Sequence, residues 1–245
     1  MSLQNASLEE LRKELVRKEK CEKIPKRNLI IVGPPGSGKG TQAALLQEEY
    51  CFCHFASGDI FRNEISRKTE NGLKALEIMN RGELLPNELA LKMLNMSGFM
   101  KRPECKYGVI FDGYPRTLEN VVDYHKIFDD EHHKLNGIIE LQIDLNKLIE
   151  RVEGRRIHTA SGRSYHVKFN PPKQEGVDDV TGEPLIQRKD DTKETILKRY
   201  EAYNKQTKPI LGFYKDNYSS IYRVISSDKP IDQVYNDLKS IINKL

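Results

Sequence analysis

Short apolar runs and longer amphipathic segments alternate along most of this chain. Segments in which apolar residues recur every three or four positions are typical of α-helices, and single short apolar runs are typical of strands that are buried on both faces. The apolar runs predict strands at residues 29–33, 52–56, 108–112, 137–143 and 220–225. The amphipathic segments predict helices at residues 39–50, 59–68, 71–81, 87–102, 117–128, 145–154, 192–217 and 231–244. This alternation predicts an α/β fold in which a parallel five-stranded sheet is flanked by helices.

Two segments depart from the alternation of strands and helices. Residues 57–86 contain helical patterns with no strand between them, so we interpret this stretch as a small helical insertion. Residues 155–191 are polar, with glycine, proline and aromatic residues interleaved, and they predict a small β-rich excursion from the main body.

Residues 1–27 form an extension that is rich in lysine and glutamate. The sequence Ser7-Leu8-Glu9-Glu10 is a capping-box pattern that predicts the start of a helix. The following apolar residues recur at helical spacing: Leu8, Leu11, Leu15 and Val16. We therefore expect a short amphipathic helix that packs on the main body. Its many glutamates argue against a mitochondrial presequence, because such segments are poor in acidic residues.

The charge balance restricts the class of partner. The chain of 245 residues has 40 Lys and Arg against 36 Asp and Glu, a formal net charge of +4. This modest excess is spread along the chain, so it favours small anionic ligands over a nucleic-acid surface, which needs a concentrated basic stripe. No apolar run approaches the roughly 20 residues that span a bilayer. We therefore expect no nucleic-acid or membrane partner and a cytosolic location.

The cysteines point to the same compartment. Four are present: Cys21, Cys51, Cys53 and Cys105. Their spacing matches neither a zinc site nor the framework of a disulfide-rich scaffold. We therefore expect free thiols and a reducing environment.

A glycine-rich stretch is the strongest sign of chemistry. The sequence Gly33-Pro34-Pro35-Gly36-Ser37-Gly38-Lys39-Gly40-Thr41 directly follows the apolar run Leu29-Ile30-Ile31-Val32. Glycines at this spacing let successive backbone N–H groups point into one cavity, and the helix that starts near Lys39 directs its positive end to the same place. This stretch predicts a seat for nucleotide phosphates. Ser or Thr usually follows the lysine directly, whereas here Gly40 intervenes before Thr41.

Four further segments indicate which kind of nucleotide-binding protein this is. Ala56-Ser57-Gly58-Asp59 with Arg62 follows the second predicted strand, and Phe111-Asp112-Gly113-Tyr114-Pro115-Arg116 contains the end of the third. Gly154-Arg155-Arg156 opens the polar excursion, and Arg188-Lys189-Asp190-Asp191 closes it, with Arg199 on the next helix. Together with the glycine-rich loop, this order resembles the adenylate kinase branch of the nucleoside monophosphate kinases over residues 28–245. The resemblance implies a core (28–55, 87–153 and 192–245), a monophosphate-binding segment (56–86) and a lid (154–191).

The arginines suit the reaction that the resemblance implies. Phosphoryl transfer between two nucleotides needs no protein base, because the attacking oxygen belongs to an anionic phosphate. It needs alignment, neutralisation of negative charge and exclusion of water. Arginine makes planar, two-pronged contacts with phosphate oxygens that lysine does not reproduce. The arginines concerned are Arg62, Arg116, Arg151, Arg155, Arg188 and Arg199.

The resemblance implies a role for each matching position. Residues expected to act directly in the transfer are Lys39, Arg116, Arg155, Arg188 and Arg199. Residues expected around ATP are Gly36, Ser37, Gly38, Lys39, Gly40, Thr41, Arg151, Arg155, Ser164, Tyr165 and Lys229. Residues expected around AMP are Ser57, Arg62, Leu85, Gly113, Arg116, Asn120, Arg188 and Arg199. Closure of the lid over both nucleotides would exclude water.

Two metal expectations follow from the resemblance. Mg²⁺ is expected to arrive with ATP and to be held largely through water near Asp112, with no direct protein ligand. Some members bind zinc in the lid, and the matching positions here are His158, Ser161, Asp178 and Thr181. This set makes a poor tetrahedral zinc site, so we expect a hydrogen-bond cluster and no structural zinc.

The choice of nucleotide rests on two positions. Ser57 stands where adenine-specific members usually have Thr, and Asn120 stands where they have Gln, so UMP or CMP is an alternative acceptor. The long lid favours AMP, while GTP is an alternative donor. A non-catalytic nucleotide sensor would be expected to lack some of the bridging arginines, and none is missing. We expect a monomer.

Overall fold

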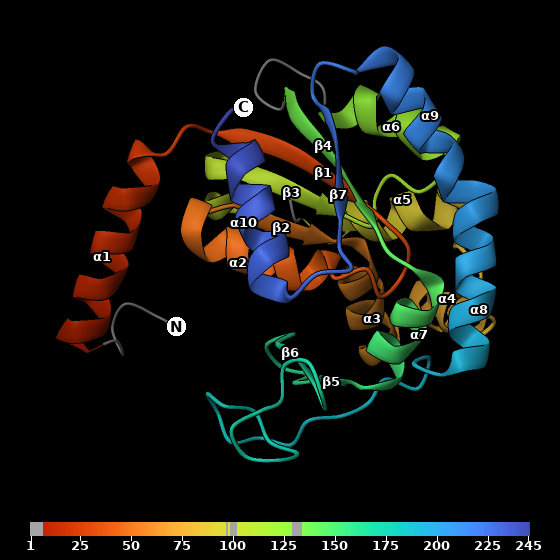
Figure 1. The fold of residues 1–245 in the computed structure, drawn as a ribbon, viewed down its shortest axis with the longest axis horizontal. Helices are drawn as coiled ribbons and strands as arrows, with labels where there is room; N and C mark the ends of the chain where they lie inside the picture. Colours follow the sequence, from red (N-terminus) through yellow and green to blue (C-terminus); the bar gives the residue numbers. More distant parts are fainter. Residues whose placement is uncertain (1–6, 97, 99–101, 129–133) are drawn as a thin grey trace.

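The structure is a computed structural model that describes residues 7–96, 98, 102–128 and 134–245. Five parallel strands form its central sheet in the order β2-β3-β1-β4-β7 (Figure 1). Their bounds are β1 (Arg27–Val32), β2 (Cys53–Ala56), β3 (Gly108–Asp112), β4 (Leu135–Gln142) and β7 (Tyr222–Ser226). The predicted α/β fold is therefore confirmed.

Helices connect the strands and cover both faces of the sheet. Their bounds are α1 (Leu8–Lys23), α2 (Lys39–Tyr50), α3 (Ser57–Ser66), α4 (Glu70–Asn80), α5 (Asn87–Met96), α6 (Leu118–Phe128), α7 (Leu145–Glu153), α8 (Lys193–Ala202), α9 (Lys208–Asn217) and α10 (Ile231–Ile242). A 3₁₀ turn (η3, Pro103–Tyr107) precedes β3. A π-helical turn (η4, Tyr203–Thr207) joins α8 to α9, where we predicted one uninterrupted helix. The predicted helix 87–102 ends at Met96, and residues 97 and 99–101 lie outside the described residues.

The alternation of side chains along β1 explains the two-sided core. Leu29 and Ile31 pack in one cluster with residues of α2 and α10. Ile30 and Val32 pack on the other face, in a cluster that includes residues of α5, α6 and α9. Every side chain of β1 from Asn28 onward is buried. The strand is covered on both faces, and this explains the continuous apolar run at residues 29–32. The phosphate-binding stretch follows at its carboxyl end, where ligands bind in open parallel sheets.

The polar excursion contains a two-stranded antiparallel sheet, β5 (Arg155–Ile157) and β6 (Ser164–His166). His166 joins this sheet to the body, because its Nε2 lies 3.2 Å from the carbonyl oxygen of Glu150 in α7. Nδ1 of His166 accepts hydrogen bonds from the backbone N–H groups of Lys168 and Phe169, both at 3.0 Å. Burial lowers the pKa of His166, which agrees with a neutral ring in this arrangement.

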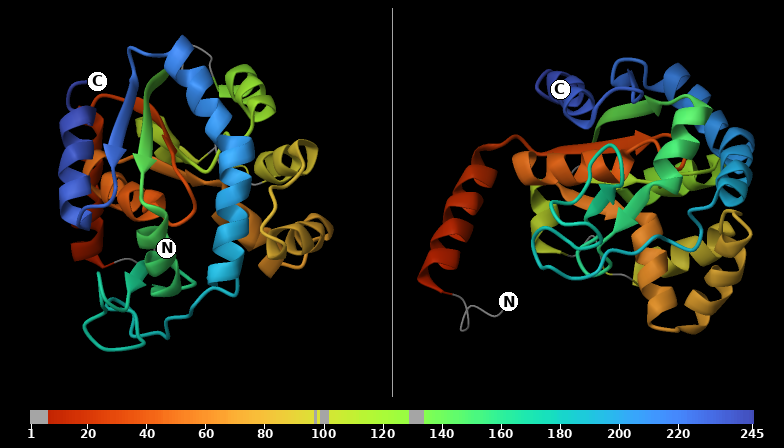
Figure 2. Two further views of the ribbon diagram at one scale, coloured as in Figure 1. Left: turned by 45° about the vertical axis from the view of Figure 1, so that its right-hand side comes forward. Right: turned by 60° about the horizontal axis from the view of Figure 1, so that its bottom comes forward.

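The N-terminal helix forms as predicted but packs differently. Ser7 and Glu10 form the predicted capping box at the start of α1. However, Leu8, Leu15 and Val16 are 76%, 58% and 65% exposed, so the expected packing of these residues on the body is wrong. Figure 2 shows α1 projecting from the remainder of the molecule. Cys21 is its only buried residue.

The cysteines also correct the sequence-based expectation of free thiols. Cys21 is bonded to Cys51, and Cys53 is bonded to Cys105. The partners are 30 and 52 residues apart in sequence, so spacing could not pair them. Cys53 and Cys105 meet because β2, which begins at Cys53, lies beside β3, and η3 places Cys105 just before β3. Cys21 and Cys51 meet where the last turn of α1 lies against the end of α2. None of the helices in the described parts of the chain is long and apolar enough to cross a membrane.

Candidate active site

The glycine-rich stretch forms a tight loop between β1 and α2. Gly38 caps α2 with φ of 92°, in the left-handed region that glycine adopts without strain. The side chain of Lys39 folds back into the loop, where its Nζ donates to the carbonyl oxygens of Gly33 at 2.8 Å and Pro34 at 3.0 Å. The loop therefore directs an ammonium group and a helix N-terminus at one place, which is the arrangement that binds phosphate.

Lys39 lies in an unfavourable environment for a cation. Burial lowers its pKa to about 8, and the charges of Arg116, Arg199 and Arg155 act in the same direction, while Asp112 opposes them. A buried ammonium group with too little negative charge around it is stabilised in its charged form when an anion binds beside it.

The predicted arginines come together from separate elements. Burial and the charge of Arg199 lower the pKa of Arg116 to about 10. Burial, Arg62 and Arg155 likewise lower the pKa of Arg188 to about 10. Burial, with Arg155 and Arg62, also lowers the pKa of Arg199. The structure thus places like charges within electrostatic reach of one another, which is unfavourable unless a polyanion binds among them.

Three aspartates partly neutralise the arginines. Asp59 accepts from Arg62 at 2.5 Å and lies 3.5 Å from Arg188. The other two, Asp190 and Asp191, form the acidic end of the motif at 188–191, and the motif alone did not indicate which arginine each one binds.

Asp190 and Asp191 each hold one arginine. Asp190 is 2.8 Å from Nη1 of Arg199. Asp191 is fully buried and accepts from Nε of Arg155 at 2.8 Å, with a second contact to Nη2 of the same guanidinium. The guanidinium groups are therefore held in place by carboxylates, and we expect bound phosphates to replace some of these contacts.

A pocket beside the arginines is lined by five of the eight residues predicted for the acceptor nucleotide. Its lining includes Arg62, Leu85, Arg116, Asn120 and Arg199. It lies between α3, α4 and the start of α6, next to the carboxyl ends of β2 and β3, with Phe61 and Tyr114 as its aromatic surface.

Ser57 and Gly113, which were also predicted at the acceptor nucleotide, contact Arg116 but do not themselves line this pocket. The Ser57 hydroxyl donates to the carbonyl oxygen of Gly113 at 2.7 Å, and Nε of Arg116 donates to the same oxygen at 2.6 Å. Gly113 has φ of +74°, and a Cβ there would lie 2.8 Å from Nη2 of Arg116. The glycine thus lets the Arg116 guanidinium fold against the backbone.

Asn120 is fixed by contacts that the sequence did not indicate. Its Oδ1 accepts from the backbone N–H of Arg116 at 3.1 Å, and its Nδ2 donates to Oδ1 of Asn87. Asn87 in turn donates to Asp123 at 2.6 Å. Both polar ends of the Asn120 amide are therefore occupied in the ligand-free protein.

Arg151 lies at the edge of the phosphate loop, 4.0 Å from where a Cβ of Gly38 would stand. Its Nη2 donates to the carbonyl oxygens of Ser227 at 2.6 Å and Lys229 at 3.1 Å. The Lys229 ammonium instead pairs with Asp237 of α10 at 2.7 Å. Lys229 thus contacts Arg151 through its backbone carbonyl, while its side chain points toward α10.

Asp112 ends β3 beside the loop, where a Cβ of Gly40 would lie 3.6 Å from its Oδ2. Burial opposes ionisation of Asp112, but the hydrogen bond with His54 and the charge of Lys39 hold its pKa below the usual range. His54, at 3.2 Å, is a further neighbour that the sequence analysis missed. An ionised carboxylate next to the phosphate seat fits the water shell of Mg²⁺. In the described parts of the chain no group of three or more His, Cys, Asp or Glu residues could hold a metal directly.

The four lid positions that replace zinc ligands form the predicted hydrogen-bond cluster. His158 contacts Ser161 at 2.7 Å through Nδ1, and Asp178 accepts from the Thr181 hydroxyl at 3.0 Å. His158 Nε2 also lies 2.5 Å from Glu183, which the prediction omitted.

Two further residues complete the lid cluster around Asp178. Arg163 donates to its carboxylate at 2.7 and 2.6 Å and holds its pKa well below the usual range. The Tyr165 hydroxyl donates to the same carboxylate at 2.9 Å. This tyrosine, predicted near ATP, therefore directs its hydroxyl into the lid interior, and Ser164 precedes it in β6.

A glycine-rich loop beside a set of converging arginines on an α/β scaffold is typical of one class of protein, the phosphotransferases that act on nucleotides. A family model described as adenylate kinase matches residues 31–219. The chain is 42% identical over 242 residues to "Adenylate kinase 4" of Oryza sativa subsp. japonica, covering 99% of this chain and 98% of that protein. It is 43% identical over 239 residues to "Adenylate kinase" of Aspergillus terreus, covering 98% and 92%. The chain belongs to the adenylate kinase family, whose members transfer a phosphoryl group between ATP and AMP.

Proposed function

We propose that the two anion-binding halves of the site hold ATP and AMP with their phosphates facing each other. The loop at residues 33–41 and Arg151 hold ATP, and the pocket lined by Arg116 and Asn120, with Ser57 beside Arg116, holds AMP. The observation that carries this assignment is that Lys39 and Arg116, which belong to different halves, lie within electrostatic reach: the charge of Arg116 lowers the pKa of Lys39, and the charge of Arg199 lowers the pKa of both. Phosphates placed between the halves would supply negative charge to both groups and raise both pKa values.

Arg155, Arg188 and Arg199 supply charge where it develops during the transfer. The AMP phosphate attacks as an anion, so no residue needs to remove a proton from it. The three guanidinium groups come from β5, the segment before α8 and α8 itself, and a phosphoryl group between the nucleotides would meet all of them. Their forked donors can follow the oxygens of the transferring group as it moves, because each offers more than one N–H.

Mg²⁺ would be held largely through water beside Asp112, and Thr41, in the first turn of α2, would line the same phosphate site. When bound, the ion supplies further neutralisation of the phosphate charge. The chain itself contributes the ionised carboxylate, which His54 and Lys39 keep in that state.

The lid segment 154–191 and the helical segment 56–86 both carry arginines that the reaction needs. Movement of both toward the core would bring Arg155 and Arg62 to the phosphates and expel water, so that ATP is transferred to AMP and not to water. We propose that opening of the lid contributes to the turnover time.

For the acceptor base we propose adenine, and for the donor ATP. The neighbours of Asn120 support a fixed, narrow site: with Asn87 accepting its amide hydrogen, the side chain cannot turn freely to suit different bases. The Ser57 hydroxyl donates to the Gly113 carbonyl and lies 3.5 Å from Nη2 of Arg116, so it helps to hold Arg116 at the pocket. The monomeric state and the cytosolic location stay predictions, and the two disulfides remove one argument for the latter.

One assay tests the whole proposal. ATP, AMP and Mg²⁺ are mixed with the enzyme, ADP is measured, and GTP, UMP and CMP are then substituted in turn. We expect ADP only when both ATP and AMP are present, and loss of ATP without AMP would refute the proposal. Arg199→Lys should lower the transfer rate by at least a hundredfold, about 3 kcal/mol in the barrier. Arg223→Lys, at an exposed position of β7, serves as the matched control.

A further inference from the structure

Helix α1 is held to the body near one end. Its amino-terminal part has no buried residue, and Leu8, Leu15 and Val16 face solvent. The helix stabilises itself through its capping box and through ion pairs one turn apart, such as Lys13 with Glu9 at 2.7 Å. It can therefore stay helical without packing on the body.

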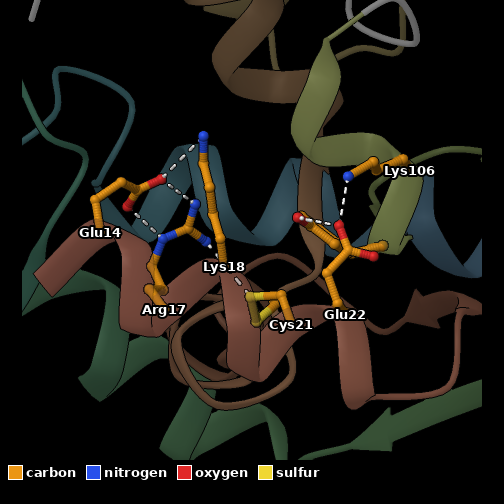
Figure 3. The surroundings of a disulfide bond; sticks show 8 residues. Glu14, Arg17, Lys18, Cys21, Glu22 and Lys106 are labelled. Carbon is orange, nitrogen blue, oxygen red and sulfur yellow. Dashed lines mark hydrogen bonds and ion pairs between the residues drawn. A yellow bond between two sulfur atoms is a disulfide. The ribbon is translucent and has the colours of Figure 1, made fainter. Parts of the chain in front are cut away.

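Near its carboxyl end, α1 contacts the body through Cys21 and Glu22 (Figure 3). Cys21 forms the disulfide with Cys51, which directly follows the phosphate-loop helix α2. Glu22 accepts from Nζ of Lys106 at 2.6 Å and from the Tyr107 hydroxyl at 3.1 Å. The side chains of Lys106 and Glu22 are 58% and 61% exposed, so this ion pair contributes little. The disulfide is the main tether of α1.

The two disulfides of the protein differ in how much structure covers them. Cys53 and Cys105 belong to the main core cluster between the sheet and its helices. Cys21 and Cys51 belong to a small separate cluster at the base of α1. Reaching the Cys21–Cys51 pair requires displacement only of the small cluster around it, which includes Tyr107 and Ile24, whereas reaching the Cys53–Cys105 pair requires opening of the core.

A cation stands beside the sulfur of Cys21. Nη1 of Arg17, one turn earlier in α1, lies 3.7 Å from Sγ of Cys21 (Figure 3). A nearby guanidinium stabilises a thiolate, and a disulfide is broken faster when the departing sulfur is stabilised as a thiolate. Arg17 thus favours departure of Cys21 when Cys51 is attacked.

We propose that the Cys21–Cys51 disulfide is a site of reversible modification by a dithiol reductant, and that this reaction releases α1 from the body. One thiolate of the dithiol attacks Sγ of Cys51, the bond between the two cysteines breaks, and Cys21 leaves as a thiolate beside Arg17. The second thiolate of the dithiol then attacks the mixed disulfide and displaces Cys51. The protein disulfide gains two electrons and two protons, and the dithiol becomes a disulfide. The Cys53–Cys105 disulfide persists.

Timed reduction tests this assignment on the full chain. The oxidised protein is incubated with dithiothreitol, samples are quenched with N-ethylmaleimide, and labelled peptides are quantified by mass spectrometry. We expect Cys21 and Cys51 to be labelled at least tenfold faster than Cys53 and Cys105. Simultaneous labelling of all four, or labelling of the core pair first, would overturn the proposal.

Two further measurements separate the parts of the proposal. Reduction should increase amide hydrogen exchange in residues 8–23, and unchanged exchange there would overturn the release of α1. Arg17→Met should slow reduction about fivefold or more, while Arg17→Lys, which keeps the charge, should not. Equal rates for wild type and Arg17→Met would overturn the assignment of Cys21 as the departing thiolate.

Discussion

Binding of ATP at pH 8.5 should draw protons out of solution and onto Lys39. Burial, together with the charges of Arg116, Arg199 and Arg155, lowers the pKa of this lysine to about 8 in the ligand-free protein. A phosphate in the loop supplies the missing negative charge, so we expect the pKa to return to its ordinary value of about 10.4.

The size of the proton uptake follows from these two pKa values. At pH 8.5 a lysine of pKa about 8 is about one quarter protonated, and a lysine of pKa about 10.4 is almost fully protonated, so each bound ATP should take up about 0.75 proton. At pH 7 the expected uptake at Lys39 is only about 0.1 proton, because the free lysine is already about nine-tenths protonated. Phosphate groups titrate near pH 6 and contribute little at pH 8.5.

Isothermal titration calorimetry in two buffers of different ionisation enthalpy measures this uptake directly. Lys39→Met should abolish most of it, and Lys244→Met, at an exposed position after α10, should retain it. An uptake below about 0.2 proton at pH 8.5, or an equal uptake in Lys39→Met, would refute the reasoning. The same shift makes the ligand-free fold less stable below pH 8, because the unfolded chain binds this proton more tightly. That penalty is relieved as the pH rises from about 8 to about 10.4.

Three further outcomes are expected. Asp191→Asn removes the buried partner of Arg155 and should lower the free energy of unfolding by about 3 kcal/mol in urea titrations, so an unchanged midpoint would contradict the pairing. Asn87→Ala leaves the amide of Asn120 without its acceptor and should raise KM for AMP more than it lowers kcat in steady-state assays, whereas equal changes would argue against a role in acceptor binding. The lowered pKa of His166 means that the unfolded state binds more protons, so stability should fall as the pH drops below about 6.5. Thermal unfolding of His166→Phe at pH 7 and pH 5 checks this, because the variant should lose less between the two.

The order and type of the main elements could be predicted because each one carries a local pattern. The apolar run before Gly33 indicates a strand, and the periodic segment after Lys39 indicates a helix. The strand is buried on both faces of the sheet, which is why its run is continuously apolar. The turn at Tyr203–Thr207 could not be predicted, since the residues of a π-helical turn follow the same helical periodicity as their neighbours.

The residues of the candidate site could be named from the sequence, but the contacts among them could not. Arginines in family positions could be named one by one from the sequence. Their aspartate partners, the support of Asn120 by Asn87, and the contact of His54 with Asp112 depend on which strands and helices become neighbours. Cys21 shows the same limit most clearly, because its partner depends on where α1 meets the end of α2.

The aspartates that hold the arginines have a kinetic consequence. Asp59, Asp190 and Asp191 occupy guanidinium groups that phosphates would take over in the proposed site, so each nucleotide that binds would displace an internal carboxylate, and a carboxylate would return when the nucleotide leaves. The loss of these ion pairs would offset part of the attraction between the arginines and phosphate. In the proposed mechanism the site recovers its own counterions as product departs, and this exchange would allow a strongly cationic site to bind nucleotides without retaining them.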